Sequence, residues 1–341
     1  MSRMILLLVS AFVSVTACSQ QIQDGVRKVK VLNYPDCLEL YNAHTSAILG
    51  HHVGGRVLQY SLNGREALYL DPKEALWQEK HSPDNPTVSA GRFDIGPEYL
   101  IPRRSELWSG RWKSEIIGPR SVRLTSPESE SAGVQLVREF RLASDSSHLQ
   151  CTQIIRNISR ETKNWCHWSR TFAKHGGIAI VPLTPELSRL PNHYVMYRAR
   201  GLVNFLPEDP NIRRNGKYLE ITGPPAQPKL GMDSHAGWFA YQMPEDILFV
   251  KRYRTYPDRV YNDLASITIS IWYPTADQIP ACELEPIGPR FTIQPGEASA
   301  FTEHWWLLES SFSKSGKPDS NRIGRLVEKM TKSPDGGSEQ K

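Results

Sequence analysis

The sequence predicts an all-β fold, specifically a large antiparallel sandwich. Short stretches of alternating apolar and polar residues recur along most of the 341-residue chain, and turns rich in glycine, proline and asparagine separate them. Helical periodicity is scarce, because only residues 321–331 place several apolar side chains on one face of a helix. So many strands with so few helices are typical of two packed antiparallel sheets.

The first 17 residues have the pattern of a lipoprotein signal peptide. A basic segment at Arg3 precedes an apolar run over residues 5–15, which is shorter than the about 20 residues that span a bilayer. The run ends in Val15-Thr16-Ala17-Cys18, which is similar to the bacterial lipobox and predicts lipidation of Cys18. Ordinary cleavage after Ala17 is the alternative. Because Ser19 follows, we expect a lipid-anchored protein of the bacterial cell envelope, in the outer membrane facing the periplasm.

The remaining chain is predicted to form a single folded domain. Residues 18–30 are polar and form a tether, residues 31–310 form the β-sandwich, and residues 311–341 form a short helix and a disordered tail. The formal net charge of +5 is spread along the chain, so we expect no nucleic acid as a partner. No glycine-rich phosphate loop is present in the sequence, and no cofactor is predicted.

The cysteines and histidines give no metal-binding pattern. Four cysteines remain after Cys18, and their spacing is not that of metal ligands. Cys151 and Cys166 lie symmetrically about a polar turn, which would let them face each other across a hairpin. His51 and His52 are adjacent, so in a strand they would point to opposite faces and would not share a metal ion.

The expected strands follow from alternation and from the turn residues between them. Asn63-Gly64 is a strong hairpin signal, because both residues tolerate positive φ, and Gly54-Gly55 suggests a bulge or a close backbone approach. Residues 71–102 are expected to form a long ordered loop with short strands, and residues 187–214 give a mixed pattern. The remaining expected strands are residues 47–52, 53–62, 66–70, 107–117, 121–126, 133–142, 147–157, 165–172, 177–182, 237–242, 247–253, 266–273, 282–285 and 298–308.

Two carboxylates near the end of this series are the first candidates for a site. Glu283 and Glu285 are two residues apart in a predicted strand, so their side chains share one face of a sheet. Pro286 and Pro289 then end the ladder, because proline lacks the N–H donor. A carboxylate held at a strand end can act as a fixed acid or base, and the alternative is a pair of solvated surface charges.

Several short motifs follow one another along most of the chain. In order, they are Val53-Gly54-Gly55-Arg56-Val57, Tyr60-Ser61-Leu62-Asn63-Gly64, Lys229-Leu230-Gly231, Gly237-Trp238-Phe239-Ala240-Tyr241, Lys251, Tyr256-Pro257-Asp258, Glu283-Leu284-Glu285-Pro286-Ile287-Gly288-Pro289, Pro295-Gly296-Glu297 and Glu303-His304-Trp305. Together they resemble galactose mutarotase-like proteins, the superfamily of the aldose 1-epimerases, and in particular a bacterial lipoprotein branch of it. The similarity extends from about residue 31 to residue 308. It implies a β-supersandwich of two large antiparallel sheets with a sugar-binding concave face.

The resemblance assigns chemistry to two residues. Mutarotation needs a base for the anomeric hydroxyl and an acid for the ring oxygen. Leu284-Glu285-Pro286 matches the motif of the family's base, so Glu285 is the candidate base and Glu283 is second. His167 is the candidate acid, although Trp165-Cys166 separates it from Asn164 and Ser169-Arg170 stands where the enzymes carry an aromatic residue. The expected sugar-binding residues are Arg92, Trp168, Arg170, Trp238, Lys251 and Glu283.

Two functions compete at this point. In the first, the protein isomerises a sugar as an aldose mutarotase or epimerase does, with a lyase as a less favoured variant. In the second, it is a non-catalytic glycan-binding lipoprotein. A structural role in the envelope is a third alternative. The first function requires His167 and Glu285 on one face, within about the width of a sugar ring.

Overall fold

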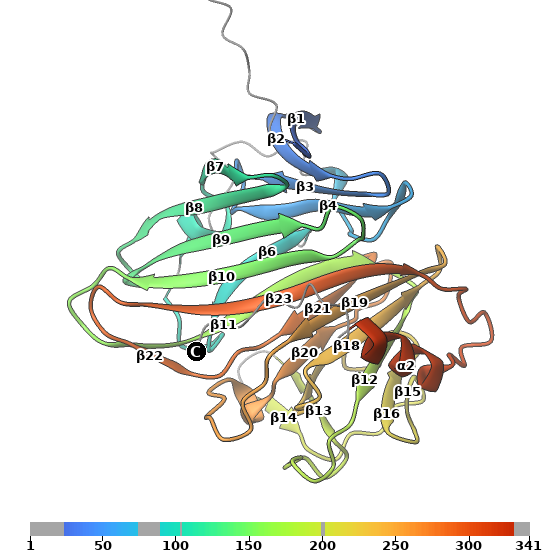
Figure 1. The fold of residues 1–341 in the computed structure, drawn as a ribbon. Helices are drawn as coiled ribbons and strands as arrows, with labels where there is room; N and C mark the ends of the chain where they lie inside the picture. The colour runs from blue at the N-terminus through green and yellow to red at the C-terminus, as the bar shows by residue number, and fades with distance from the viewer. Residues whose placement is uncertain (1–23, 74–88, 103, 199–201, 331–341) are drawn as a thin grey trace, which may run out of the picture.

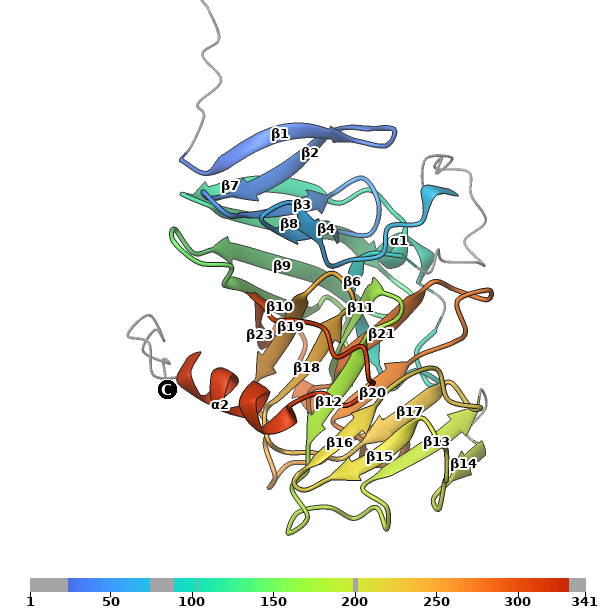
Figure 2. The same ribbon diagram turned by 90° about the vertical axis from the view of Figure 1, so that its right-hand side faces the viewer.

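Two large antiparallel sheets pack face to face across one hydrophobic core (Figures 1 and 2). The structure is a computed structural model that describes residues 24–73, 89–102, 104–198 and 202–330. The signal peptide, residues 18–23 of the tether (with Cys18) and the tail from residue 331 lie outside these residues. The all-β sandwich predicted from the sequence is confirmed. None of the helices in the described ranges is long and apolar enough to cross a membrane.

The larger sheet has 13 strands and the smaller has ten. In spatial order the larger sheet contains β1 (Val26–Val31), β2 (Tyr34–Tyr41), β3 (Thr45–Gly50), β4 (Arg56–Leu62), β6 (Gly91–Gly96), β11 (Lys163–Lys174), β21 (Ala281–Pro286), β20 (Ile269–Trp272), β17 (Lys229–Met232), β13 (Tyr194–Arg198) and β14 (Leu202–Asn204), with β5 (Arg65–Glu66) beside β4 and β22 (Phe291–Ile293) beside β11. The smaller sheet contains β15 (Ile212–Asn215), β16 (Tyr218–Ile221), β12 (Ile178–Pro182), β18 (Trp238–Met243), β19 (Ile247–Tyr253), β23 (Ala298–Glu309), β10 (Leu149–Asn157), β9 (Val134–Leu142), β8 (Ser121–Ser129) and β7 (Lys113–Gly118).

Glycine positions explain two of the connections. Asn63 and Gly64 both have positive φ and close the predicted hairpin between β4 and β5. Gly54 and Gly55 also have positive φ, and a Cβ atom on Gly55 would lie only 2.4 Å from the Trp112 ring. The predicted close backbone approach is therefore confirmed, with an indole as the neighbour.

Some elements differ from the expectation. The helix predicted near the C-terminus is confirmed as α2 (Ser320–Met330). The strand predicted over residues 107–117 is wrong in its first half, where the short helix α1 (Ser105–Trp108) precedes β7. Strands β1, β2, β16 and β17 were not predicted, and β1 alternates poorly because the adjacent residues Arg27 and Lys28 are both exposed.

The cysteine pairing suggested by the hairpin is wrong. Cys37, Cys151, Cys166 and Cys282 are all free and buried. Cys151 packs in the main core between the sheets, whereas Cys166 belongs to a separate cluster with Trp168 and Tyr197. The two thiols therefore lie on different sides of the larger sheet.

Alternation along β11 and β21 separates two environments. Ala173, Cys282 and Leu284 belong to the main core and point toward the smaller sheet. Trp168 and Arg170, which alternate with them in β11, point the other way and meet Glu283 and Glu285 from β21. We call this side of the larger sheet its outer face. The short helix α2 covers part of the smaller sheet on the other side of the molecule (Figure 2).

Candidate functional site

Charged side chains gather on the outer face where β6, β11, β21, β20 and β17 lie side by side. Four are cationic and four are carboxylates, and they surround one tryptophan. Register accounts for their grouping, because Arg170 lies opposite Arg92 and Trp168 lies opposite Asp94 across the β11–β6 ladder. We call this group the charged face, and it consists of Arg92, Asp94, Glu98, Arg104, Trp168, Arg170, Lys229, Glu283 and Glu285.

The two glutamates form the centre of the charged face, as the spacing in the sequence predicts. Both side chains are fully buried, and two cations neutralise them. Arg170 Nε donates to Glu283 Oε1 at 2.9 Å. Lys229 Nζ donates to Glu285 Oε1 and lies 3.5 Å from Glu283 Oε2. Trp168 Nε1 donates to Glu285 Oε2 at 2.5 Å, so both oxygens of Glu285 have a donor.

The environments of the two glutamates shift their pKa values in opposite directions. Burial raises the pKa of both carboxyls, but the Arg170 and Lys229 charges outweigh it at Glu283 and lower the pKa of that group. Burial and the neighbouring Glu283 charge raise the pKa of Glu285. Two adjacent carboxylates in one buried site do not both ionise freely, so the second proton stays on Glu285 to higher pH.

Trp168 supports the two cations and is not itself open to a ligand. Its ring is buried, with Arg170 5.3 Å and Lys229 5.7 Å from the ring centroid. The predicted stacking of a sugar on Trp168 therefore has no free ring face to use. The indole instead positions Arg170, Lys229 and Glu285.

Arg92 has unused hydrogen-bonding capacity on the charged face. Its side chain is buried over the Trp108 ring, 5.0 Å from the centroid. Its Nε and Nη1 atoms have no hydrogen-bond partner among the described residues. Burial and the nearby Arg170 charge lower the pKa of Arg92 to about 9. Beside it, Asp94 binds Arg104 at 2.8 Å, while its Oδ2 atom has no hydrogen-bond partner in the described part of the chain and lies 3.7 Å from Arg170 Nη1.

His167 lies on the opposite face of β11 from Glu285, so the structure does not bring the predicted acid and base together. Its imidazole packs between Phe93 and Phe301, with centroids 5.7 Å away in each case. Its Nε2 atom lies 3.2 Å from the carbonyl oxygen of Ser299. Burial lowers the pKa of His167 to about 3, so the ring is a neutral member of the core. Assigning His167 as the acid partner of Glu285 is therefore wrong.

Two other predicted sugar-binding residues also lie elsewhere. Lys251 reaches from β19 into the space between the sheets, where its Nζ atom lies 3.2 Å from Glu303 Oε2 and contacts Thr171 Oγ1. Trp238 packs beneath α2, in a cluster with Ile323 and Val327. Neither residue shares a face with Glu285. The structure thus groups Arg92, Trp168, Arg170, Glu283 and Glu285 and excludes Lys251 and Trp238.

Sequence reasoning missed Lys229 as a site residue. Lys229 belongs to one of the short motifs, but the motif assigns it no chemical role. A lysine in a short strand whose other residues are buried is a usable signal, because an unpaired lysine is rarely found inside a sheet. Asp94 gave a weaker signal, since the strand that carries it was expected only as part of a long loop.

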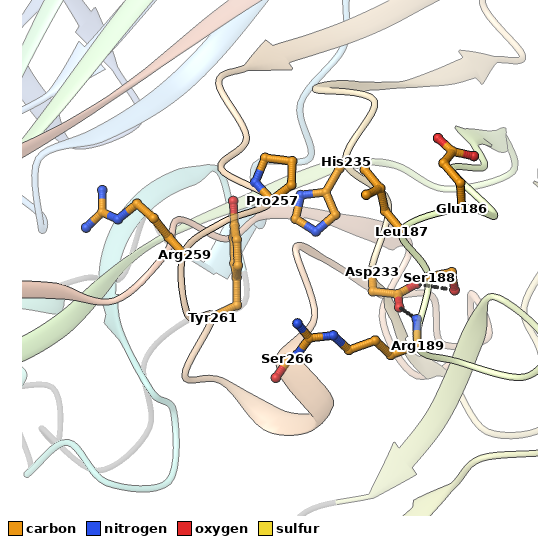
Figure 3. Close-up of a pocket in the computed structure, with 10 residues that line it drawn as sticks. All are labelled: Glu186, Leu187, Ser188, Arg189, Asp233, His235, Pro257, Arg259, Tyr261 and Ser266. Atoms are coloured by element: carbon orange, nitrogen blue, oxygen red, sulfur yellow. Dashed lines mark hydrogen bonds between the residues drawn. The ribbon is translucent and has the colours of Figure 1, made fainter.

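A pocket of about 330 Å³ lies beyond the end of β17 (Figure 3). Asp233 follows β17 and binds the Ser188 hydroxyl at 2.8 Å and the Arg189 backbone N–H at 2.6 Å, as the dashed lines in Figure 3 mark. His235 lies edge-on to Tyr261 in the same pocket, and burial lowers the pKa of His235. Such a volume is in the range of small-ligand pockets. The pocket is lined by Glu186, Leu187, Ser188, Arg189, Asp233, His235, Pro257, Arg259, Tyr261 and Ser266.

The fold is that of the galactose mutarotase-like proteins. A provisionally named aldose 1-epimerase from Escherichia coli K12 aligns with a TM-score of 0.57 at 12% identity, over 80% of this chain and 99% of its own. Galactose mutarotase-like proteins from Lactobacillus casei ATCC 334 and Clostridium acetobutylicum align with TM-scores of 0.55 and 0.54, at 10% and 11% identity. They cover 80% and 84% of this chain, and 100% and 99% of their own chains.

No protein-family model matches the chain, and no curated protein sequence matches it. At identities of 10–12% the structural likeness establishes the fold. The resemblance inferred from the short motifs is therefore confirmed for the architecture. What the chain does has to be argued from its own residues.

Proposed function

We propose that the protein binds a carbohydrate on the charged face. The observation that carries this proposal is the Arg92 guanidinium, which is only 4% exposed and has two nitrogens without a hydrogen-bond partner among the described residues. A buried donor without a partner costs roughly 1–3 kcal/mol. A ligand oxygen placed against Arg92 would recover that free energy.

The balance of charges favours a ligand rich in hydroxyl groups. Arg92 offers unused donors, and the nearby Asp94 Oδ2 and Glu283 Oε2 atoms are acceptors without a hydrogen bond among the described residues. A hydroxyl group both donates and accepts, so a polyol can bind both kinds of atom. A simple anion would suit Arg92 but would also face the carboxylates of Asp94 and Glu283, which repel it.

A second candidate is sugar isomerisation by the two glutamates themselves. It is favoured by the opposite pKa shifts of Glu283 and Glu285, because such a pair separates an ionised base from a protonated acid. In this scheme Glu283 takes the proton of the anomeric hydroxyl and Glu285 gives one to the ring oxygen. After ring opening and rotation, the two transfers reverse. Glu285, assigned from the sequence as the base, acts as the acid in this scheme, and Glu283 acts as the base, while His167 takes no part.

One NMR experiment tests binding and isomerisation together. Anomer exchange and ligand chemical shifts are followed on a panel of aldoses and uronic acids. The variants are Arg92→Met and Glu285→Gln, and the matched controls are the exposed Arg325→Met and Glu161→Gln. Binding that Arg92→Met weakens at least about tenfold, while Arg325→Met does not, supports the charged face.

The outcomes for catalysis are separate. The isomerase is supported if the protein catalyses anomer exchange, the Glu285→Gln variant loses this activity and the Glu161→Gln variant keeps it. Binding without exchange leaves a glycan-binding protein and contradicts the catalytic assignment. No binding by any sugar of the panel, or binding that Arg92→Met does not weaken, contradicts the proposal for the charged face.

We also propose that Cys18 is lipidated and anchors the chain in the outer membrane, facing the periplasm. The support is the lipobox-like sequence, which lies outside the described residues. A Cys18→Ser variant should lose incorporation of labelled fatty acid and leave the membrane fraction. Retention of the variant in that fraction, or a mature N-terminus other than Cys18, would contradict lipidation.

A further inference from the structure

Three potential metal ligands meet at the edge of the larger sheet, away from the charged face. Asp36 lies in β2, and His51 and His52 lie in the turn that follows β3. The β2–β3 register places Leu38 opposite Leu49, and its continuation brings Asp36 to His51. One ligand atom from each residue can be chosen so that all three lie within 4.8 Å of one another.

The prediction that His51 and His52 point to opposite faces is wrong, because the two residues lie in a turn and not in a strand. It assumed that His51 and His52 continue a strand and point to opposite faces. Strand β3 ends at Gly50, and both histidines lie in a turn, which brings their rings to the same side. The ring centroids are 4.0 Å apart, and His52 also stacks on Tyr34.

Hydrogen bonding satisfies only part of this group, because the Asp36 carboxylate pairs with His52 but not with His51. His52 Nε2 lies 2.5 Å from Asp36 Oδ1, and His51 Nε2 lies 3.8 Å from Asp36 Oδ2, beyond hydrogen-bond range. His51 is buried, and its Nδ1 atom has no hydrogen-bond partner among the described residues. One carboxylate between two imidazoles thus leaves ring nitrogens unused.

We propose that Asp36, His51 and His52 bind a divalent transition-metal ion of the zinc class. Two imidazole nitrogens and one carboxylate oxygen form a donor set that suits such ions. Ligand bonds of about 2.0–2.2 Å at tetrahedral angles place donor atoms roughly 3.3 Å apart. The His51–Asp36 separation of 3.8 Å is about half an ångström longer than that spacing. The His52–Asp36 separation of 2.5 Å is shorter than that spacing, so binding an ion requires the His51 ring to move toward Asp36 and the His52 ring to move away from it. Three protein ligands then leave one tetrahedral position for water.

Two features limit the affinity of this site. Arg111 and Lys28 place positive charge near His51. Among the residues that the structure describes, the Nδ1 atoms of both histidines have no carbonyl or carboxylate partner of the kind that commonly orients a ligating imidazole. We therefore expect the ion to have a structural role, in which it connects β2 to the turn after β3 and stabilises the fold. In the sheet order, β4 lies between β3 and β6, which is the nearest strand of the charged face, so the ion does not contact the charged face.

The test uses the whole mature chain, stripped of metal and titrated with Zn²⁺, and with Co²⁺ as a spectroscopic probe. We expect one strongest site per chain, a Co²⁺ absorption spectrum with nitrogen and oxygen ligands, and a rise in melting temperature with Zn²⁺. The His52→Gln variant should weaken binding at least about tenfold and abolish the rise in melting temperature. The matched control is His148→Gln, which removes one member of another histidine pair, 2.9 Å from His304, and should leave the strongest site unchanged.

A wild-type measurement covers the case in which the variant does not fold. Paramagnetic Cu²⁺ at substoichiometric concentration should broaden the amide resonances of Asp36, His51 and His52 before any others. Broadening that begins at His148 and His304, Zn²⁺ binding that His52→Gln does not change, or no binding up to about millimolar Zn²⁺ would each overturn the proposal.

Discussion

Removing the Lys229 ammonium should destabilise the fold in a pH-dependent way. The ammonium is the shared cation of two fully buried carboxylates, with Glu283 Oε2 3.5 Å away and Glu285 in direct contact. At an effective dielectric constant of about 20, a 3.5 Å pair attracts by roughly 5 kcal/mol. Lys229→Met keeps the length of the side chain but leaves Glu285 without its cation. Breaking a buried pair in this way typically costs about 3–5 kcal/mol. We expect the free energy of unfolding of Lys229→Met to fall by an amount in that range above about pH 8.

The sign of the pH dependence follows from Glu285. Its folded-state pKa is raised, so its contribution to stability is fully present below the unfolded-state pKa and is lost as the pH rises through the folded value. Removing the Lys229 charge raises that folded pKa further. The stability difference between Lys229→Met and wild type should therefore be smallest near about pH 5 and largest near about pH 9.

Urea unfolding at both pH values measures these differences, and a double variant makes the test specific. Lys229→Met combined with Glu285→Gln removes the cation and the titrating carboxyl together, so it should be more stable than Lys229→Met alone near about pH 9. The control is Lys217→Met, because the Lys217 side chain is 62% exposed and its ammonium lies 3.7 Å from Glu328. A loss below about 1 kcal/mol for Lys229→Met, or an equal loss at both pH values, would refute the reasoning.

Three further predictions concern the core. His167 has a pKa of about 3 in the folded state, below its unfolded value of about 6.5, so stability is lost as the pH falls from 6.5 toward 3. Between about pH 7 and pH 4, the free energy of unfolding measured with urea should therefore fall by roughly 3 kcal/mol less in His167→Phe than in wild type. An equal fall in both proteins would contradict this. Gly55→Ala should cost roughly 2–4 kcal/mol in the same assay, because Gly55 combines positive φ with contact to Trp112. Gly216→Ala, at positive φ in open space, should cost less, and equal costs would exclude the contact as the cause. The four buried cysteines should react with a thiol reagent only after unfolding, and two or fewer reactive thiols in denaturant would reveal a disulfide.

Much of the fold could be predicted because a strand that buries one face alternates apolar and polar residues along the sequence. Strand β10 was predicted to within two residues because its buried and less buried positions alternate, and β19 was predicted with its observed bounds from a short apolar run. The glutamate pair could be predicted for a related reason. Glu283 and Glu285 are two residues apart in a strand, so their side chains share one face of the sheet. Strands such as β1, with charged residues at successive positions, carry no such pattern.

What alternation does not specify is which of the two faces belongs to the core. His167 and Trp168 are adjacent in β11 and necessarily point to opposite sides. Both are compatible with a core or a site, and only the packing of Phe93 and Phe301 from other strands decides between them. Lys251 is a similar case, because its partner Glu303 is 52 positions away in the chain and lies on the neighbouring strand β23. The residues that neighbour His167 and Lys251 in the sequence do not indicate either of these contacts.

The indole N–H resonance of Trp168 offers the most direct test of carbohydrate binding on the charged face. This N–H donates to Glu285, so a sugar bound beside Arg92 and Arg170 should shift the resonance during an NMR titration. The indole resonance of Trp238, which packs beneath α2, should stay in place and serves as the internal control. A shift at Trp168 alone is the predicted result. A sugar that binds without moving the Trp168 resonance, or that moves Trp238 instead, would contradict the assignment of the charged face.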